Sequence, residues 1–299
     1  MKILLFGKGG QLGWELQRSL APLGELVALD FDSEEHCGDF TNPAGLAATV
    51  RDVRPDVIVN AAAHTAVDKA ESEPDLARTI NATAPGILAH AALQLGAWLV
   101  HYSTDYVFDG SGSRPWVEED VPAPLSVYGK TKLEGEQAIQ SSGCQHLIFR
   151  TSWVYAARGG NFAKTMLRLA KERDRLTVID DQIGAPTGAE LLSDVTAHAL
   201  RAVAGLERRP ELAGLYHVAA GGETSWHGYA RSLLETAQKA GVLFKTTPDQ
   251  VEPIPSSSFP TPAQRPLNSR LATHKLQNAF GLHLPPWQAG VTRMLSEIL

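Results

Sequence analysis

Two residues that can do chemistry together stand four positions apart in the segment SVYGKTK, residues 126–132. Tyr128 carries a phenol and Lys132 an ammonium, and on a helix residues at this spacing lie on one face. A phenol is a poor acid at neutral pH, but a nearby positive charge stabilises the phenolate that proton donation leaves behind. The pair therefore predicts a proton donor, with Tyr128 protonating an oxygen as hydride reaches its carbon.

A second group of polar residues follows the apolar run WLVHYS at residues 98–103. In open α/β sheets the carboxyl ends of the strands face the ligand, so Ser103, Thr104 and Asp105 are expected to point into a crevice. Thr104 is well placed to hydrogen-bond a substrate carbonyl. The alternative is that these hydroxyls satisfy the backbone at the strand end.

These groups need a scaffold, and the apolar pattern predicts one. Short apolar runs occupy residues 2–6, 25–30, 56–60, 98–103 and 146–153, and helix-length segments begin near Gly10, Pro43, Pro74 and Ser126. Continuous apolar strands separated by helices are typical of a parallel sheet covered on both faces. We expect an α/β fold, a doubly wound Rossmann-type parallel sheet, over residues 1–155.

Residues 156–299 show a different pattern of expected helices and strands. Helical patterns at 160–173, 187–204 and 224–240 are mixed with a short strand at 214–219, and a stretch rich in Pro and Ser follows at 252–266. Long loops over a scaffold often line binding sites. We expect this part to form mainly a smaller C-terminal substrate-binding lobe, with some later segments free to complete the sheet.

The first expected strand runs into three glycines, Gly7, Gly10 and Gly13, at the start of a helix. Glycine lets the backbone turn tightly and approach a pyrophosphate, while the helix N-terminus offers free N–H groups. Asp30 ends the second strand at the distance expected for a carboxylate that binds the adenosine ribose. Such a carboxylate repels a 2′-phosphate and favours NADH. The alternative is an Asp that caps a turn.

A further carboxylate stands in the segment CGDFTN. Asp39 can accept a hydrogen bond from the adenine amino group, with Phe40 against the ring. Equally, Asp39 can open the turn before Pro43. The sequence leaves both alternatives open.

Composition excludes several classes of protein. A net charge of -6 argues against a broad nucleic-acid footprint or a basic membrane surface. No apolar stretch approaches the ~18 residues that span a bilayer, and the N-terminal apolar run is shorter than that of a signal peptide. Cys37 and Cys144 stand far apart without metal-type spacing. We expect a cytoplasmic protein that binds neither nucleic acid nor membrane.

Taken together, the motifs resemble those of the extended short-chain dehydrogenase/reductases that act on sugar nucleotides. The matching segments cover nearly the whole chain: GKGGQLG, NAAAHTAVDKAE, STDYVFDG, VYGKTKLEGE, RTSWVY, GGNFAKTML, DDQIGAPT and QRPLNSRL. One departure is His64, where the family pattern has Tyr. The resemblance implies reduction of the 4-keto group of dTDP-4-dehydro-6-deoxy-L-mannose by NADPH or NADH, for bacterial surface polysaccharide such as the O-antigen of lipopolysaccharide.

The same resemblance implies roles for individual residues. Tyr128 would be the proton donor, Lys132 would hold the nicotinamide ribose and tune Tyr128, and Thr104 would assist at the carbonyl. Asn81 matches the Asn that often completes this group. The cofactor would contact Gly7, Gly10, Gln11, Leu12, Gly13, Asp30, Asp39, Phe40, Ala63, His64, Thr65, Tyr102, Tyr128 and Lys132.

The sugar nucleotide would face Thr104, Asp105 and Trp153. A core aromatic at a strand end is the alternative for Trp153. Arg265, in the Pro-rich stretch, either clamps a diphosphate or is a solvated loop residue.

Members of the resembled family are homodimers with Mg²⁺ at the subunit contact. Glu190 and Asp194 stand four apart on an expected helix, Glu15 lies on the helix after the glycines, and carboxylate oxygens suit Mg²⁺. Solvated carboxylates near a helix N-terminus are the alternative. Any such Mg²⁺ would be structural, because a tyrosine acid needs no metal.

Two competing functions share this fold. Nucleotide-sugar dehydratases and epimerases carry the same glycines and Tyr/Lys pair, but dehydratases typically have Glu after the strand-end Asp, where this chain has Tyr106. One acid suffices for a ketone reduction. A non-catalytic binding subunit is the other alternative, and the presence of Thr104, Tyr128 and Lys132 favours an enzyme.

Overall fold

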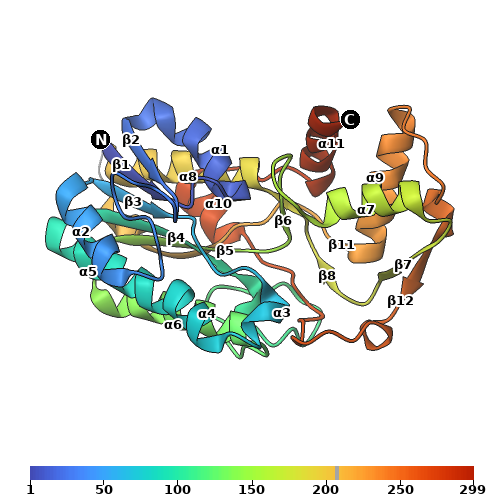
Figure 1. Cartoon of the computed structure of the whole chain (residues 1–299), viewed down its shortest axis with the longest axis horizontal. Coiled ribbons are helices and arrows are strands. Elements are labelled where there is room, and N and C mark those ends of the chain that lie inside the picture. The colour runs from blue at the N-terminus through green and yellow to red at the C-terminus, as the bar shows by residue number, and fades with distance from the viewer. Residues whose placement is uncertain (206–208) are drawn as a thin grey trace.

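The computed structural model describes residues 1–205 and 209–299. Its centre is a six-stranded parallel sheet with strand order β10-β5-β4-β3-β1-β2 (Figure 1). The strands are β1 (Lys2–Phe6), β2 (Glu25–Leu29), β3 (Val57–Asn60), β4 (Trp98–Thr104), β5 (His146–Thr151) and β10 (Gly214–His217). The predicted α/β class and all five predicted sheet strands of the first part are confirmed.

Helices cover both faces of this sheet, which explains why its central strands are apolar without alternation. All residues of β3 and β4 are buried. One face packs against α1 (Gln11–Leu20), α8 (Ala189–Ala204) and α10 (His274–Phe280). The other face packs against α2 (Pro43–Val53), α5 (Ala84–Leu95) and α6 (Val127–Ser142), as Figure 1 shows.

The connection between β3 and α5 is itself helical. It contains α3 (Val67–Ala70), α4 (Pro74–Arg78) and a π-helical turn at Thr79–Thr83. Single π-helical turns are rare and occur frequently at functional sites.

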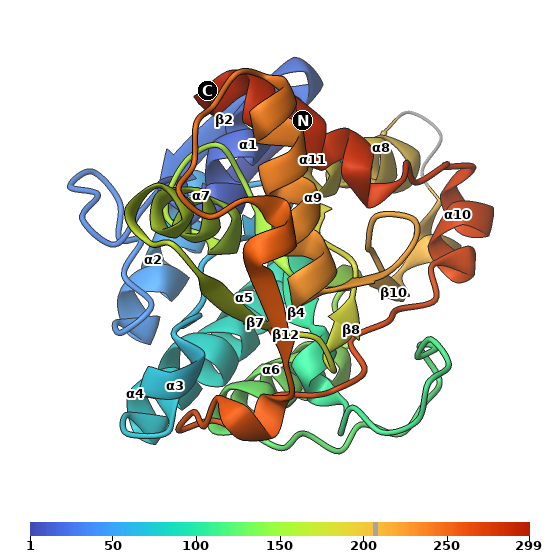
Figure 2. The ribbon, with the colours of Figure 1, turned by 90° about the vertical axis from the view of Figure 1, so that its right-hand side faces the viewer.

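The later part of the chain both completes the sheet and builds the C-terminal lobe. Strand β10 pairs in parallel with β5 and forms one edge of the sheet. The lobe has its own buried cluster, formed largely by α7 (Phe162–Glu172), α9 (Trp226–Lys239) and α11 (Trp287–Ile298). Figure 2 looks onto this lobe, with α9 toward the viewer.

Three two-stranded sheets connect segments of the lobe that lie far apart in the sequence. The pairs are β7 (Leu176–Ile179) with β12 (Val251–Ile254), β8 (Ile183–Gly184) with β11 (Thr224–Ser225), and β6 (Val154–Tyr155) with β9 (Thr187–Gly188). The Pro- and Ser-rich stretch at 252–266 therefore starts inside a strand, continues through a 3₁₀ turn at Ser256–Ser258 and is irregular from there on.

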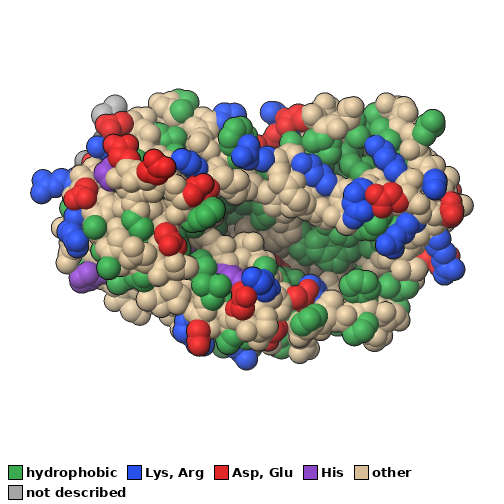
Figure 3. Space-filling view, in the orientation of Figure 1, with side chains coloured by type: hydrophobic (Ala, Val, Ile, Leu, Met, Phe, Trp, Pro, Cys, Tyr) green, Lys and Arg blue, Asp and Glu red, His purple; other side chains and the backbone are tan. Residues whose placement is uncertain are grey.

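The face drawn in Figure 3 is hollowed between the sheet and the lobe, and hydrophobic side chains line much of the hollow. Across the described residues, the model has no helix with both the length and the apolar character that a membrane crossing requires.

Candidate active site

The glycines after β1 form a turn that only glycine can make. Gly7 has φ +83°, and the N–H of Gly10 donates to the carbonyl of Gly7 at 3.1 Å. A Cβ at Gly13 would lie 1.8 Å from that same carbonyl oxygen, so a side chain there would force α1 away from the turn. Helix α1 begins at Gln11, which directs its first N–H groups toward the cavity described next. This cradle fits a dinucleotide pyrophosphate.

A cavity of about 740 Å³ opens at the carboxyl ends of the central strands. It brings together most of the residues predicted from the sequence: Gly7, Gly10, Gln11, Leu12, Asp30, Asp39, Phe40, Ala63, Thr65, Tyr102, Thr104, Asp105, Tyr128, Lys132 and Trp153. Gly13 and His64 lie just outside this lining, since Gly13 packs beneath Gly7 and the backbone of His64 is held by a neighbouring side chain.

Asp30 lies on the rim of this cavity with its carboxylate already oriented. One carboxylate oxygen accepts from the N–H of Gly9 at 2.8 Å and the other from the N–H of Phe31 at 3.0 Å. The side chain of Phe31 is 74% exposed and lines the same rim. Sequence reasoning missed Phe31, although an aromatic residue directly after the expected ribose-binding Asp was a usable signal.

Asp39 and Phe40 line the cavity, and each also makes contacts that hold the surrounding structure together. Both carboxylate oxygens of Asp39 accept hydrogen bonds from Thr41, as expected of an Asp that opens the turn before α2, while its contact with the adenine amino group stays a prediction. The ring of Phe40 is buried and meets Phe6 edge to face at 5.6 Å between centroids.

Tyr128 is positioned by the start of α6. The hydroxyl of Ser126 accepts from the N–H of Gly129 at 3.2 Å and caps the helix, which the sequence predicted to begin near this residue. A Cβ at Gly129 would lie 2.2 Å from the carbonyl oxygen of Tyr106, so glycine allows α6 to approach the end of β4 closely. The rings of Tyr106 and Tyr128 then pack edge to face, 5.6 Å apart.

The environment of Tyr128 keeps its phenol protonated. Burial raises the pKa of Tyr128 to about 12, and a hydrogen bond with the Thr104 hydroxyl offsets part of that rise. The negative charge of Asp105 acts in the same direction as burial. At neutral pH the phenol therefore holds the proton that a general acid must supply.

Lys132 lies deeper than the sequence suggested. Its side chain is buried, and its Nζ donates to the carbonyl of Tyr102 at 2.6 Å and lies 3.2 Å from His101 Nε2. Burial lowers the pKa of Lys132 to about 8, while Glu136 acts in the opposite direction. The ammonium is thus much easier to deprotonate than an exposed lysine.

Asp105 is the most strongly buried carboxyl beside the phenol, with 1% of its surface exposed. One oxygen accepts from the Thr104 hydroxyl at 3.2 Å, and the other has no hydrogen-bond partner within the described part of the chain. Burial raises the pKa of Asp105 to about 7, while the nearby hydroxyls of Ser269 and Thr104 act in the opposite direction. Thr104 therefore stands between a phenol and a carboxyl that titrates near neutrality.

Asn81, in the same region, holds the backbone of His64 through two hydrogen bonds. Its Oδ1 accepts from the N–H of His64 at 2.8 Å, and its Nδ2 donates to the carbonyl of His64 at 3.1 Å. Asn81 sits in the π-helical turn and also contacts the Thr131 hydroxyl. It holds in place the irregular segment after β3, in which Ala63 and Thr65 line the cavity.

Trp153 connects the cavity to the lobe. Its φ of +51° is in the left-handed region, an unfavourable conformation for a bulky residue that is typical of functional sites. The ring stacks on Trp226 with centroids 3.7 Å apart, and Trp226 Nε1 donates to Gln182 at 3.1 Å. Trp226, which sequence reasoning missed, lines this cavity and a larger one in the lobe.

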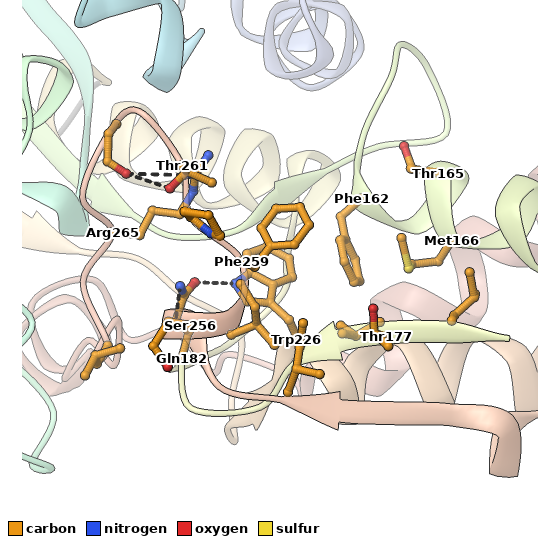
Figure 4. A pocket seen from close by; sticks show the side chains of 18 of the residues that line it. Phe162, Thr165, Met166, Thr177, Gln182, Trp226, Ser256, Phe259, Thr261 and Arg265 are labelled. Atoms are coloured by element: carbon orange, nitrogen blue, oxygen red, sulfur yellow. Dashed lines mark hydrogen bonds between the residues drawn. The ribbon is translucent and has the colours of Figure 1, made fainter.

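The larger cavity has a volume of about 1130 Å³ and lies between α7, β7 and the stretch after β12. Figure 4 shows Phe162, Trp226 and Phe259 grouped around it, with Gln182 bonded to Ser256. Arg265 also lines it, and its partly buried guanidinium pairs with Asp68 at 2.8 Å, so it is not a solvated loop residue. Its role as a clamp on a diphosphate stays a prediction.

The carboxylates considered for a metal are paired with arginines within one chain. Glu15 and Asp194 both contact Arg18, and Glu190 contacts Arg293 at 3.1 Å. Over residues 1–205 and 209–299, no cluster of three or more His, Cys, Asp or Glu side chains could hold a metal ion. A single chain does not assemble the magnesium site expected from the sequence.

A parallel sheet with a glycine turn, and a Tyr/Lys pair opening into the same cavity, is the architecture of the extended short-chain dehydrogenase/reductases. A family model described as the RmlD substrate binding domain matches residues 1–299. Curated dTDP-4-dehydrorhamnose reductases of Salmonella typhimurium and Shigella flexneri are 63% and 62% identical to this chain, covering 100% of it and 98% of each relative. The chain belongs to the dTDP-4-dehydrorhamnose reductase family.

Solved structures agree with this assignment. The dTDP-4-dehydrorhamnose reductase of Bacillus anthracis, in complex with NADP, superposes with a TM-score of 0.88 at 35% identity and covers 99% of both chains. The resemblance drawn from the sequence motifs is therefore confirmed.

Proposed function

We propose that this protein reduces the 4-keto group of dTDP-4-dehydro-6-deoxy-L-mannose with NADPH or NADH, which gives dTDP-L-rhamnose. The observation that carries the proposal is identity of 61 to 63% over the full chain with three dTDP-4-dehydrorhamnose reductases. The cavity supports it, because a phosphate cradle and a protonated phenol open into the same cavity.

The nicotinamide cofactor would supply the hydride to C4 when bound. Tyr128 then gives its phenolic proton to the C4 oxygen, which becomes the new hydroxyl. The Thr104 hydroxyl, which is bonded to Asp105 before the reaction, can turn to the phenolate oxygen and stabilise it. In this mechanism one proton and one hydride are delivered, so no second acid is required.

The choice between NADH and NADPH depends on Asp30 at the rim of the cavity. The fixed Asp30 carboxylate fits two ribose hydroxyls and repels a 2′-phosphate, whereas the Bacillus anthracis relative binds NADP. We therefore propose that both cofactors are used and that Asp30 makes NADH the more competitive of the two.

The position after Asp105 supports a reductase over a dehydratase. Tyr106 is largely buried there, and both burial and the charge of Asp105 raise the pKa of its phenol. A side chain in that state does not remove a proton from carbon at neutral pH, which is the task that the dehydratase acid performs.

The direct test follows NAD(P)H absorbance at 340 nm with the keto-sugar nucleotide generated in place. We expect consumption of one reduced cofactor per substrate and a product with the mass of dTDP-L-rhamnose. A purified, folded protein that consumes neither cofactor under these conditions would contradict the assignment and leave a binding role.

Three finer features belong to the same proposal. The product would feed surface polysaccharide such as O-antigen, and the free thiols of Cys37 and Cys144 suit a cytoplasmic, reducing location. The protein would act as a homodimer. Any structural Mg²⁺ would need carboxylates from two chains, since Glu15, Glu190 and Asp194 are held by arginines in one.

A further inference from the structure

Beneath the cavity, three buried side chains form a line of hydrogen bonds from β3 through β4 to α6. Asn60 Nδ2 lies 3.0 Å from His101 Nδ1, and His101 Nε2 lies 3.2 Å from Lys132 Nζ. The exposed fractions of Asn60, His101 and Lys132 are 1%, 1% and 2%. The mechanism above assigns no role to Asn60 or His101.

The orientation of the Asn60 amide is fixed by the backbone. Its Oδ1 accepts from the N–H of Ala62 at 3.0 Å, so the amide nitrogen must be the atom that faces His101. An amide nitrogen only donates, and His101 Nδ1 must therefore present its lone pair. A neutral imidazole then carries its proton on Nε2.

That proton points at Lys132. An ammonium has donors only, so a charged Lys132 would place N–H against N–H across 3.2 Å, between two side chains that are only 1% and 2% exposed. A neutral amine accepts from His101 Nε2–H with its lone pair and still donates to the carbonyl of Tyr102. The geometry thus favours the uncharged lysine.

We propose that Asn60 and His101 are positioning residues that hold the imidazole proton on Nε2 and so bias Lys132 toward its neutral amine. This inference rests on the proposed reductase function. The Asn60–His101–Lys132 hydrogen-bond line then sets the pH above which activity falls, because the Lys132 ammonium that stabilises the phenolate loses its proton at a lower pH than an ordinary lysine does. Substitution of Asn60 or His101 should move this alkaline limit to a higher pH.

The other charges around Lys132 do not reverse this bias. Glu136 lies one turn further along α6 and favours the ammonium, but both its oxygens are held by Arg150 on β5, at 2.9 and 2.6 Å. Tyr128, on the same helix, is uncharged at neutral pH, and Asp105 acts on Tyr128 from the end of β4. Burial lowers the pKa of His101 well below its usual value and keeps this ring neutral whether Lys132 is charged or not.

The first test requires no activity. In protein with ¹⁵N-labelled histidine and without cofactor, NMR should show one ring in the Nε2–H tautomer that does not titrate between about pH 6 and 9. His101→Gln assigns that signal by removing it. An Nδ1–H tautomer, or a ring that becomes charged in this range, overturns the proposal even if the protein is a reductase.

The second test uses the pH profile of kcat. In Asn60→Asp, the new carboxylate can accept from both Ala62 N–H and His101 Nδ1–H, which moves the imidazole lone pair to Nε2 and favours the ammonium. We expect the alkaline limb to shift upward by about one pH unit, as a hydrogen bond to the charged form should cause. His101→Gln, whose amide oxygen can face Lys132, should shift it in the same direction.

The control for these variants is His146→Gln, which changes a partly buried histidine at the start of β5 and should leave the limb in place. A merely structural role for His101 would lower kcat at every pH without moving the limb, and that result overturns the proposal. If Asn60→Asp does not fold, His101→Gln and the NMR measurement decide the question.

Discussion

Replacement of Tyr128 by Phe removes one oxygen from the site and leaves the packing intact. The ring sits edge to face against Tyr106 at the start of α6, and Phe can keep that contact. What disappears is the phenolic proton and its hydrogen bond with Thr104. The variant thus separates the chemistry of the hydroxyl from the shape of the cavity.

Loss of the hydrogen bond and loss of the phenolic proton should differ in their energetic cost. A hydrogen bond of this kind contributes about 1 kcal/mol to stability, a small part of the total for a domain. A positioned general acid contributes about 10² to 10⁴ in rate, which corresponds to roughly 3 to 5 kcal/mol in the barrier. We therefore expect kcat to fall at least 10²-fold, while the unfolding midpoint changes little.

The assay compares steady-state NADPH oxidation, NADPH affinity and thermal unfolding in Tyr128→Phe and Tyr216→Phe. Tyr216 is the matched control, because its hydroxyl donates to the carbonyl of Leu212 at 2.8 Å on the sheet-edge strand β10. The control should lose similar stability and keep its rate. A Tyr128→Phe enzyme within about threefold of the wild-type kcat, far less than a general acid contributes, would remove Tyr128 from the mechanism.

Three further variants probe the surrounding groups. The carboxyl of Asp105 has a folded pKa of about 7, above its unfolded value, so wild-type stability should fall by up to about 4 kcal/mol as pH rises from 4 to 8. Asp105→Asn should lack that loss, and parallel urea-unfolding profiles for the two proteins would refute the buried-acid assignment. Asp30→Ala should raise the KM for NADH more than that for NADPH, whereas equal increases mean that Asp30 does not meet the ribose. Glu136→Gln leaves Arg150 buried without its partner and should cost about 3 to 5 kcal/mol in urea unfolding, a loss that Glu136→Gln with Arg150→Met should largely recover.

The sheet and its cavity were predictable because they depend on local signals. Continuous apolar runs mark strands that helices cover on both faces, and glycines at fixed spacing mark the turn before α1. The start of α6 near Ser126 was likewise predictable, since its cap acts within one helical turn. The close approach of Gly129 to the carbonyl oxygen of Tyr106 depends instead on the whole fold.

The lobe was less predictable because short strands carry almost no periodic signal. Strands β6, β8, β9 and β11 have two residues each and pair across long sequence separations. The stack of Trp153 on Trp226 depends on that pairing and on an unfavourable backbone conformation at Trp153. Neither propensity nor spacing indicates such a contact.

The protonation states at the site also lay beyond the sequence. The Tyr128/Lys132 spacing was interpreted as a phenol tuned by an ammonium, but burial raises the pKa of the phenol and lowers that of the amine. Burial depends on the whole fold, and the partners of Lys132 on β4 lie about 30 positions earlier in the chain. Spacing predicted that the two side chains share one face of a helix, but it did not fix their charge.

We propose that this cavity delivers one hydride to C4 of a dTDP-linked 4-keto sugar and that Tyr128 delivers the proton. The most direct measurement supplies NADPH deuterated at the transferred position and analyses the sugar nucleotide by mass spectrometry and NMR. We predict a single deuterium at C4 of dTDP-L-rhamnose in wild-type protein and a large drop in its formation with Tyr128→Phe. Deuterium absent from C4, or formation at the wild-type rate in that variant, would contradict the account.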